Sequence, residues 1–252
     1  MQADKTRFKD LFSGHADDYA KFRPVYPDEL YQRLSQLAPA QDCAIDCGTG
    51  NGQAALQLAH YFKQVIAADP SQAQIDKAER HERIQYCVAR AEALPVPTGS
   101  ADLMTVAQAL HWFQHGAFAK EVERILRPNG VLAAWGYDLT KITPEVDQVI
   151  LHLYNDVLGP YWQPERRLVD SHYQTIKYPW KELTLPALKM TADWTLVELN
   201  GYLKTWSALQ SFVQHSHDHH KLDQAFIDLR QAWGKVEKRP VEWPIFVRAW
   251  SI

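Results

Sequence analysis

Short apolar runs alternate with amphipathic stretches between residues 42 and 135. The apolar runs favour buried strands, and the stretches between them place Leu, Ile, Ala and Val at the three- and four-residue spacing of helices that lie on a sheet. The expected strands are Cys43–Cys47, Val65–Ala68, Ile84–Val88, Leu103–Val106 and Val131–Trp135, and the expected helices are Ala54–Phe62, Ala73–His81 and Phe118–Leu126. Alternation of this kind predicts a parallel sheet with crossover helices.

Different patterns flank this alternating region. Prolines punctuate the sequence after Trp135 and predict irregular connections around a few helices, and an aromatic-rich run near the last residues predicts a strand that returns to the sheet. Pro244 within that run favours an edge position or a bulge. The expected elements are helices at Phe8–Phe22, Pro27–Leu37, Glu145–Leu158 and Leu196–Leu209, and a final strand at Val241–Trp250.

Composition narrows the classes of protein that remain. The chain has 252 residues and a formal net charge of −3, so one domain is expected and a dedicated nucleic-acid-binding protein is disfavoured. No apolar run approaches the roughly 20 residues of a membrane span, and the polar start does not resemble a signal peptide. We therefore expect a cytoplasmic protein without a membrane partner. The three cysteines are expected to be buried, reduced thiols.

The sequence Asp46-Cys47-Gly48-Thr49-Gly50-Asn51-Gly52 joins an expected strand to an expected helix. Glycines at such a junction let the backbone turn sharply and approach a ligand closely. In dinucleotide-binding folds the third glycine follows the second by three residues, where this chain has Gln53. Asp46 also places a carboxylate where a cationic amino-acid end is better tolerated than a diphosphate. The loop therefore favours S-adenosylmethionine, which has an ammonium group and no phosphate, over a nicotinamide dinucleotide.

Polar residues follow the next two expected strands. Asp69 ends the second strand, where a carboxylate can accept both hydroxyls of a ribose, although it can equally cap the next helix ahead of Pro70. Ala91 and Glu92 follow the third strand, where a polar contact to an adenine edge is expected.

These segments, together with the strand Asp102–Val106 and the sequence Gln108-Ala109-Leu110-His111-Trp112-Phe113, resemble the class I S-adenosylmethionine-dependent methyltransferases of the methyltransferase type 11 family over about residues 40–135. Shorter motifs, among them Gly159-Pro160-Tyr161-Trp162 and Thr205-Trp206-Ser207-Ala208, are similar to those of the fungal trans-aconitate methyltransferase group. The resemblance implies an α/β, Rossmann-like fold with a mostly parallel seven-stranded sheet, helices on both faces, an antiparallel last strand and a C-terminal lid insertion.

The resemblance also implies how one domain would be divided. A helical cap is expected at residues 1–38, a cofactor-binding core at 40–136, a lid or substrate region with the sixth strand at 137–240, and the final strand at 241–252.

The resemblance further implies which residues hold S-adenosylmethionine. The glycine loop would hold its methionine part, Asp69 the ribose, and Ala91 with Glu92 the adenine, while Gln108 and His111 form the floor near the sulfonium. The expected cofactor residues are Arg23, Asp46, Gly48, Thr49, Gly50, Gly52, Asp69, Pro70, Ala91, Glu92 and Gln108. Gln74 stands where the family often has a methionine or leucine against the adenine, which leaves that contact open.

The implied reaction transfers the methyl group to a small molecule, with a carboxylic acid as the first candidate. A carboxylate is ionised at neutral pH and needs no general base, and an arginine can fix its direction through two hydrogen bonds. We therefore expect Arg166 and Arg167 to bind the acceptor, with Arg23 closing over the cofactor carboxylate or the substrate. The arginine pair could instead be surface charges.

Other candidate residues have two interpretations each. His111 would be a general base if the nucleophile is a hydroxyl or an acidic carbon, or it simply packs beside Trp112. Several aromatic side chains would wall the acceptor pocket, although core packing explains them nearly as well. These are Tyr19, Trp135, Tyr137, Tyr161, Trp162 and Trp206. The histidines between His215 and His220 favour a solvated loop, so no metal is expected.

Three other functions stay open. A nicotinamide-dependent oxidoreductase is opposed by the glycine spacing and by Asp46. A binding protein without activity would hold S-adenosylmethionine but turn over no acid, phenol or amine. Methylation of another acceptor, including RNA or protein, requires only a local patch of charge. The acceptor atom and the oligomeric state are not determined by the sequence.

Overall fold

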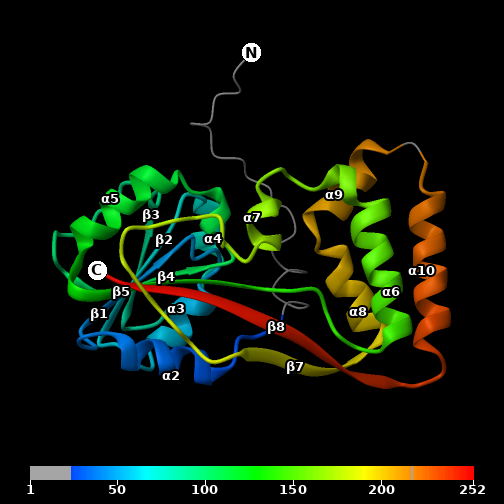
Figure 1. Cartoon of the computed structure of the whole chain (residues 1–252), viewed down its shortest axis with the longest axis horizontal. Coiled ribbons are helices and arrows are strands. Elements are labelled where there is room, and N and C mark those ends of the chain that lie inside the picture. Colours follow the sequence, from blue (N-terminus) through cyan, green and yellow to red (C-terminus); the bar gives the residue numbers. More distant parts are fainter. Residues whose placement is uncertain (1–23, 217) are drawn as a thin grey trace, which may run out of the picture.

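The computed structural model describes residues 24–216 and 218–252. A single mixed sheet, flanked by helices, forms one half of the molecule, and a group of helices forms the other half (Figure 1). The predicted helix Phe8–Phe22, the candidates Tyr19 and Arg23, and His217 lie outside the described residues. Within the rest of the chain, no helix is both long enough and apolar enough to cross a bilayer.

The sheet has eight strands, in the order β3-β2-β1-β4-β5-β8-β6, with β7 also paired to β8. The strands are β1 Cys43–Cys47, β2 Gln64–Asp69, β3 Ile84–Val88, β4 Ala101–Ala107, β5 Leu126–Tyr137, β6 Lys181–Leu183, β7 Leu188–Thr195 and β8 Lys238–Ser251. Strands β1 to β5 pair in parallel, and β8 is antiparallel to each of its neighbours. The expected Rossmann-like class and the antiparallel last strand are confirmed. The expected count of seven strands is wrong, because β7 adds an eighth.

Strand β8 joins the two halves of the molecule. Its second half pairs with β5 and β6, and its first half pairs with β7 from Lys238 to Ile245. On one side Pro244 pairs with Lys189 of β7, and on the other side it lies one residue beyond the last β5 pair, Tyr137 with Ile245. The predicted edge position is thus confirmed for this side of β8. The Pro244 carbonyl accepts a hydrogen bond from the Asp138 amide, beyond the end of β5, so the missing proline N–H interrupts no β5 pairing.

Helices cover both faces of the sheet. The side chains of β1 accordingly alternate between two apolar clusters, one on each face. Ala44 packs in the cluster of α2 and α3, whereas Ile45 packs in the cluster of α5. The helices beside the sheet are α2 Asp28–Leu37, α3 Gln53–Leu58, α4 Gln72–Asp76 and α5 His115–Ile125.

The lid helices come between β5 and β8 in the sequence. They are α6 Pro144–His152, a π-helical turn at Leu153–Val157, α7 Arg166–Asp170, α8 Leu196–Lys204, α9 Ser207–His215 and α10 His220–Trp233, with the 3₁₀ turn η4 Gly159–Tyr161. Helices α6, α8, α9 and α10 stand together, and α7 lies between them and the sheet (Figure 1). The predicted helix Leu196–Leu209 is in fact two helices, because the chain leaves the helix at Thr205 and starts another at Ser207.

Candidate functional site

The glycine loop after β1 has a left-handed backbone at each of its three glycines. Gly48, Gly50 and Gly52 have φ angles of 67°, 57° and 87°. A side chain on Gly48 would lie 2.6 Å from the Ala109 Cβ, whereas one on Gly50 would meet nothing nearer than the Gln74 Oε1 at 4.0 Å. The loop thus packs tightly against the segment after β4 and borders open space at Gly50. A ligand can approach the Gly50 backbone as S-adenosylmethionine would require.

Asp46 lies beneath this loop and is fully buried. Its two carboxylate oxygens accept hydrogen bonds from the Thr49 hydroxyl at 2.5 Å and the Thr105 hydroxyl at 2.8 Å. Burial raises the pKa of Asp46 to about 6, although both hydrogen bonds lower it. In this geometry Asp46 fixes the loop that carries Thr49, and its role toward a cofactor ammonium group stays a prediction.

Asp69 connects the end of β2 to the glycine loop. Its carboxylate accepts hydrogen bonds from the Gly50 amide and the Ser71 amide, each at 2.9 Å. The Ser71 hydroxyl, not Asp69, caps α4. Asp69 is 8% exposed and accepts a hydrogen bond from Gly50, so its carboxylate lies beside the loop, where a partner for the ribose hydroxyls is expected. Pro70 follows it and is half-buried.

Ala91 and Glu92 lie in the turn after β3. Ala91 is buried, and the Glu92 carboxylate accepts a hydrogen bond from the Gln114 amide at 2.8 Å. Glu92 therefore links the β3 end to the start of α5. Gln74 faces the glycine loop from α4, at the position for which an apolar adenine contact was in doubt.

The segment after β4 lies against the glycine loop through Ala109 and Phe113, and it carries Gln108 and His111. Gln108 has a left-handed backbone with φ 53°, unusual for a residue other than glycine, and its amide donates to the Trp135 carbonyl at 2.9 Å. Strained backbone of this kind often occurs at functional sites. Ala109 contacts Gly48, so the loop and this segment form one continuous surface at the carboxyl ends of the parallel strands.

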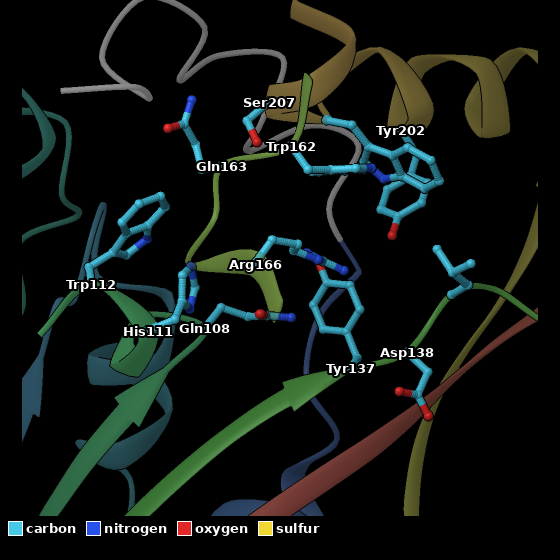
Figure 2. Close-up of a pocket in the computed structure, with 12 residues that line it drawn as sticks. Gln108, His111, Trp112, Tyr137, Asp138, Trp162, Gln163, Arg166, Tyr202 and Ser207 are labelled. Atoms are coloured by element: carbon cyan, nitrogen blue, oxygen red, sulfur yellow. The ribbon is translucent and has the colours of Figure 1, made fainter. Parts of the chain in front are cut away.

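A cleft lies between this segment and the lid. It is lined by Gln108, His111, Trp112, Tyr137, Asp138, Leu139, Trp162, Gln163, Arg166, Tyr202, Trp206 and Ser207 (Figure 2). The sheet and the lid both contribute to it, so the cleft is the candidate acceptor site.

Among the described residues that line the cleft, Arg166 is the one with a positively charged side chain. Its guanidinium lies over the Trp162 ring at 5.0 Å, and its Nε donates to the Tyr154 hydroxyl at 2.9 Å and to the Asp170 carboxylate at 3.2 Å. Figure 2 shows its side chain extended across the cleft between His111 and Tyr137. Within the described residues all its hydrogen bonds come from Nε, which leaves both terminal nitrogens for an anion.

Arg167 does not line this cleft. It is exposed, its Nε donates to the Pro164 carbonyl at 3.1 Å, and it borders an adjoining surface depression that Trp162, Gln163 and Arg166 also line. The structure therefore divides the arginine pair, with Arg166 facing inward and Arg167 facing outward.

The aromatic candidates are also divided. Trp162 and Trp206 line the cleft, as does Tyr137. Trp135 is fully buried against the edges of Tyr26 and Tyr31, and Tyr161 packs against Phe212, so neither lines the cleft. For these two residues, packing explains the side chain.

His111 is buried and neutral. Its ring lies 4.6 Å from the Trp112 ring, and its Nδ1 lies 3.2 Å from the Tyr173 hydroxyl. Burial, assisted by the nearby Arg166 cation, lowers the pKa of His111 to about 3. A base this weak is poorly suited to remove a proton from a hydroxyl group.

Sequence reasoning missed a turn that supports the cleft. His172 and Tyr173 both have left-handed backbones, with φ 50° and 57°. His172 bonds the Asp138 carboxylate at 2.6 Å, and Tyr173 bonds His111. No local motif marks such a turn, since its partners are 34 and 62 residues away in the sequence.

Metal and thiol chemistry receive no support from the described residues. Within residues 24–216 and 218–252, no three His, Cys, Asp or Glu side chains gather as metal ligands would. The thiols of Cys43, Cys47 and Cys87 are free, the first two of them buried.

The chain is similar to methyltransferases along most of its length. A family model described as a methyltransferase domain matches residues 45–134. A Dictyostelium discoideum protein named as a methyltransferase is 40% identical over 213 residues, which cover 83% of this chain and 81% of the relative. A Saccharomyces cerevisiae protein named as an S-adenosylmethionine-dependent methyltransferase is 30% identical over 182 residues, which cover 66% of this chain and 60% of that protein.

A solved structure of a type II methyltransferase from Anaeromyxobacter dehalogenans has the same fold over most of this chain. It superposes with a TM-score of 0.85 at 43% identity, covering 91% of this chain and 98% of that chain. The similarity thus includes the lid as well as the sheet that carries the glycine loop. The chain belongs to the class I S-adenosylmethionine-dependent methyltransferases.

Proposed function

We propose that this protein transfers the methyl group of S-adenosylmethionine to a carboxylate oxygen of a small molecule bound in the cleft. The observation that carries the proposal is Arg166, a cation inside an aromatic cleft whose terminal nitrogens have no hydrogen-bond partner among the described residues. A guanidinium in this setting binds a carboxylate through two parallel hydrogen bonds. The short motifs shared with the trans-aconitate methyltransferase group support the same acceptor class.

The residues of the chain divide the work between the two ligands. The Gly50 backbone and Asp69 would hold the cofactor, and Gln108 with His111 would lie between cofactor and acceptor. S-adenosylmethionine supplies a methyl group that its positive sulfur already activates. Arg166 aims the carboxylate, and Trp162 with Trp206 exclude water from the reacting atoms. As the new O–C bond forms, the C–S bond breaks and its electron pair stays on sulfur, so no proton moves.

Transfer of isotope-labelled methyl from S-adenosylmethionine tests this proposal. The acceptor panel pairs di- and tricarboxylic acids with their amides, and adds phenols, alcohols and amines of similar size. We expect labelled product with the acids alone, and the label should be released by mild alkali, as for an ester. Turnover of amines or phenols but not acids would contradict the carboxylate class. Transfer only to macromolecules of a cell extract would move the acceptor to RNA or protein.

A further inference from the structure

Tyr173 has a buried hydroxyl next to His111, beside the cleft. Methyl transfer to a carboxylate gives this hydroxyl no role. Its side chain is fully buried, and its oxygen lies 3.2 Å from the His111 Nδ1. Among the described residues this hydroxyl donates to no other group. The imidazole nitrogen is therefore the one acceptor available to this buried O–H in the described part of the chain.

This contact determines the position of the proton on His111. The buried Tyr173 O–H donates to the His111 Nδ1, because no other acceptor for it lies among the described residues. The opposite assignment would leave a buried O–H without an acceptor, which is unfavourable. An Nδ1 that accepts requires the proton of the neutral imidazole to be on Nε2. His111 lines the cleft and makes no other hydrogen bond within the described chain, so Nε2–H is available there.

The backbone around Tyr173 is arranged for this contact. His172 and Tyr173 are consecutive residues with φ angles of 50° and 57°, a strained pair for side chains that are not glycine. Arg248 holds the turn by donating to the Tyr173 carbonyl at 2.7 Å, and His172 ties it to Asp138 at 2.6 Å. Strain retained in this way indicates that the position of the Tyr173 ring is needed.

We infer that Tyr173 is a positioning residue that keeps His111 as its Nε2–H tautomer, so that His111 gives the cleft a hydrogen-bond donor in place of a general base. This inference rests on the proposed function and narrows its substrate class. The Nε2–H donor and the Arg166 cation together match an oxygen that is already negatively charged. An alcohol or an amine cation would first have to lose a proton, and the neutral His111 is held in the wrong form to take it.

Among the described residues that line the cleft, Asp138 is the one with a carboxylate side chain. Its Oδ1 is paired with His172, and Figure 2 shows its side chain turned away from Arg166 and His111. It is therefore not placed to remove a proton from an acceptor held by Arg166.

Nitrogen-15 NMR of the full chain labelled at histidine tests the tautomer without any acceptor. His111→Gln identifies the His111 signals, and two-bond proton–nitrogen correlations show which nitrogen carries the proton. We expect the Nε2–H form between pH 5 and 9, with no titration. Tyr173→Phe should lower the ratio of Nε2–H to Nδ1–H by about 3- to 10-fold, the worth of one neutral hydrogen bond.

Tyr178→Phe is the matched control, because its buried hydroxyl has no hydrogen-bond partner among the described residues. This variant should leave the His111 signals unchanged. An Nδ1–H tautomer in the wild type, titration of His111 near pH 7, or no response to Tyr173→Phe would overturn the inference.

A second pair of variants keeps the test independent of how Tyr173→Phe folds. Glutamine at position 111 carries its amide N–H near the Nε2 position, and asparagine carries it near Nδ1. With a carboxylate acceptor, His111→Gln should therefore keep at least about tenfold more activity than His111→Asn. Equal losses would contradict a donor role for Nε2. If no acid is methylated, the proposed function fails while the NMR result still decides the tautomer.

Discussion

Arg166 shows how the surroundings of a side chain decide its chemistry. Two adjacent arginines look equivalent in the sequence, yet helix α7 turns Arg166 into the cleft and leaves Arg167 in solvent. Which way each one points depends on Tyr154 and Asp170, which bind the Arg166 Nε. The sequence could predict that this arginine pair is functional, but it could not predict which of the two lines the cleft. That depends on contacts with Tyr154 and Asp170, which form only in the folded chain.

Replacement of Arg166 therefore tests acceptor binding. Arg166→Gln should raise KM for a carboxylate acceptor by about 10- to 100-fold, the worth of a hydrogen bond to a charged group, with little change in S-adenosylmethionine affinity. Initial-rate kinetics and calorimetry measure the two quantities. Arg167→Gln is the matched control and should leave KM within about twofold. An equal effect from both variants would show that Arg166 has no special contact with the acceptor.

The buried carboxyl group of Asp46 leads to a prediction about how the free energy of unfolding depends on pH. Burial raises its pKa from 3.8 to about 6, so the folded state binds this proton more tightly than the unfolded state. The resulting stabilisation is full below about pH 4 and is lost as the pH rises through about 6. Asp46→Asn lacks this loss. Relative to wild type, its free energy of unfolding should therefore increase by about 2–3 kcal/mol between pH 4 and 8.

Urea titrations at several pH values measure this difference. If the asparagine of this variant loses a hydrogen bond to either threonine, its free energy of unfolding falls by the same amount at every pH. The slope of the curve against pH is unaffected. Parallel stability curves for the two proteins would show that Asp46 titrates normally in the folded state.

At the scale of elements, the strands of the core were the most predictable. The expected bounds Cys43–Cys47 and Ile84–Val88 are confirmed. The first is a fully buried strand and reads as a nearly continuous apolar run, whereas the second is the half-exposed edge strand of the sheet. Helix α10 was missed, although Leu222, Ala225 and Leu229 have helical spacing. The polar histidines at its start concealed that pattern. Strand β7 alternates buried and exposed residues, but its partner β8 lies about 50 residues further on, which no local pattern shows.

The glycine loop gives a prediction at the same scale. Gly52→Ala should be more destabilising than Gly50→Ala, because a methyl group at position 52 would collide with the Tyr86 ring, whereas position 50 faces open space. Strain plus collision of about 2–3 kcal/mol would lower Tm by about 5–10 °C for Gly52→Ala. Gly50→Ala should lower Tm less but weaken S-adenosylmethionine binding. Thermal unfolding and calorimetry distinguish the two, and equal Tm losses would contradict this account of the loop.

At the scale of the whole molecule, we expect β8 to make the sheet and the lid one cooperative unit. The same strand pairs with β5 on one side of the molecule and with β7 on the other. Neither half can unfold without breaking its pairing to this strand. Scanning calorimetry should therefore give one transition whose calorimetric and van't Hoff enthalpies agree. Two resolved transitions would show that the lid unfolds separately.

Ligand binding should shift that transition as a whole. S-adenosylhomocysteine at about 100 times its Kd adds about 2.7 kcal/mol, which raises Tm by about 5–10 °C for a chain of this size. NAD is the control and should produce no shift. A shift with NAD alone would point to the dinucleotide class that the glycine spacing disfavours.

The aromatic lining of the cleft has a practical consequence. Trp112, Trp162 and Trp206 line the cleft, and the Arg166 guanidinium lies 5.0 Å from the Trp162 ring centre. An acceptor carboxylate that draws Arg166 away from Trp162 will alter the ultraviolet emission of that indole. Acceptor binding can therefore be followed by tryptophan fluorescence, and Trp162→Phe identifies the signal that comes from Trp162. Candidate acids can be ranked by titration before a single methyl group has been transferred.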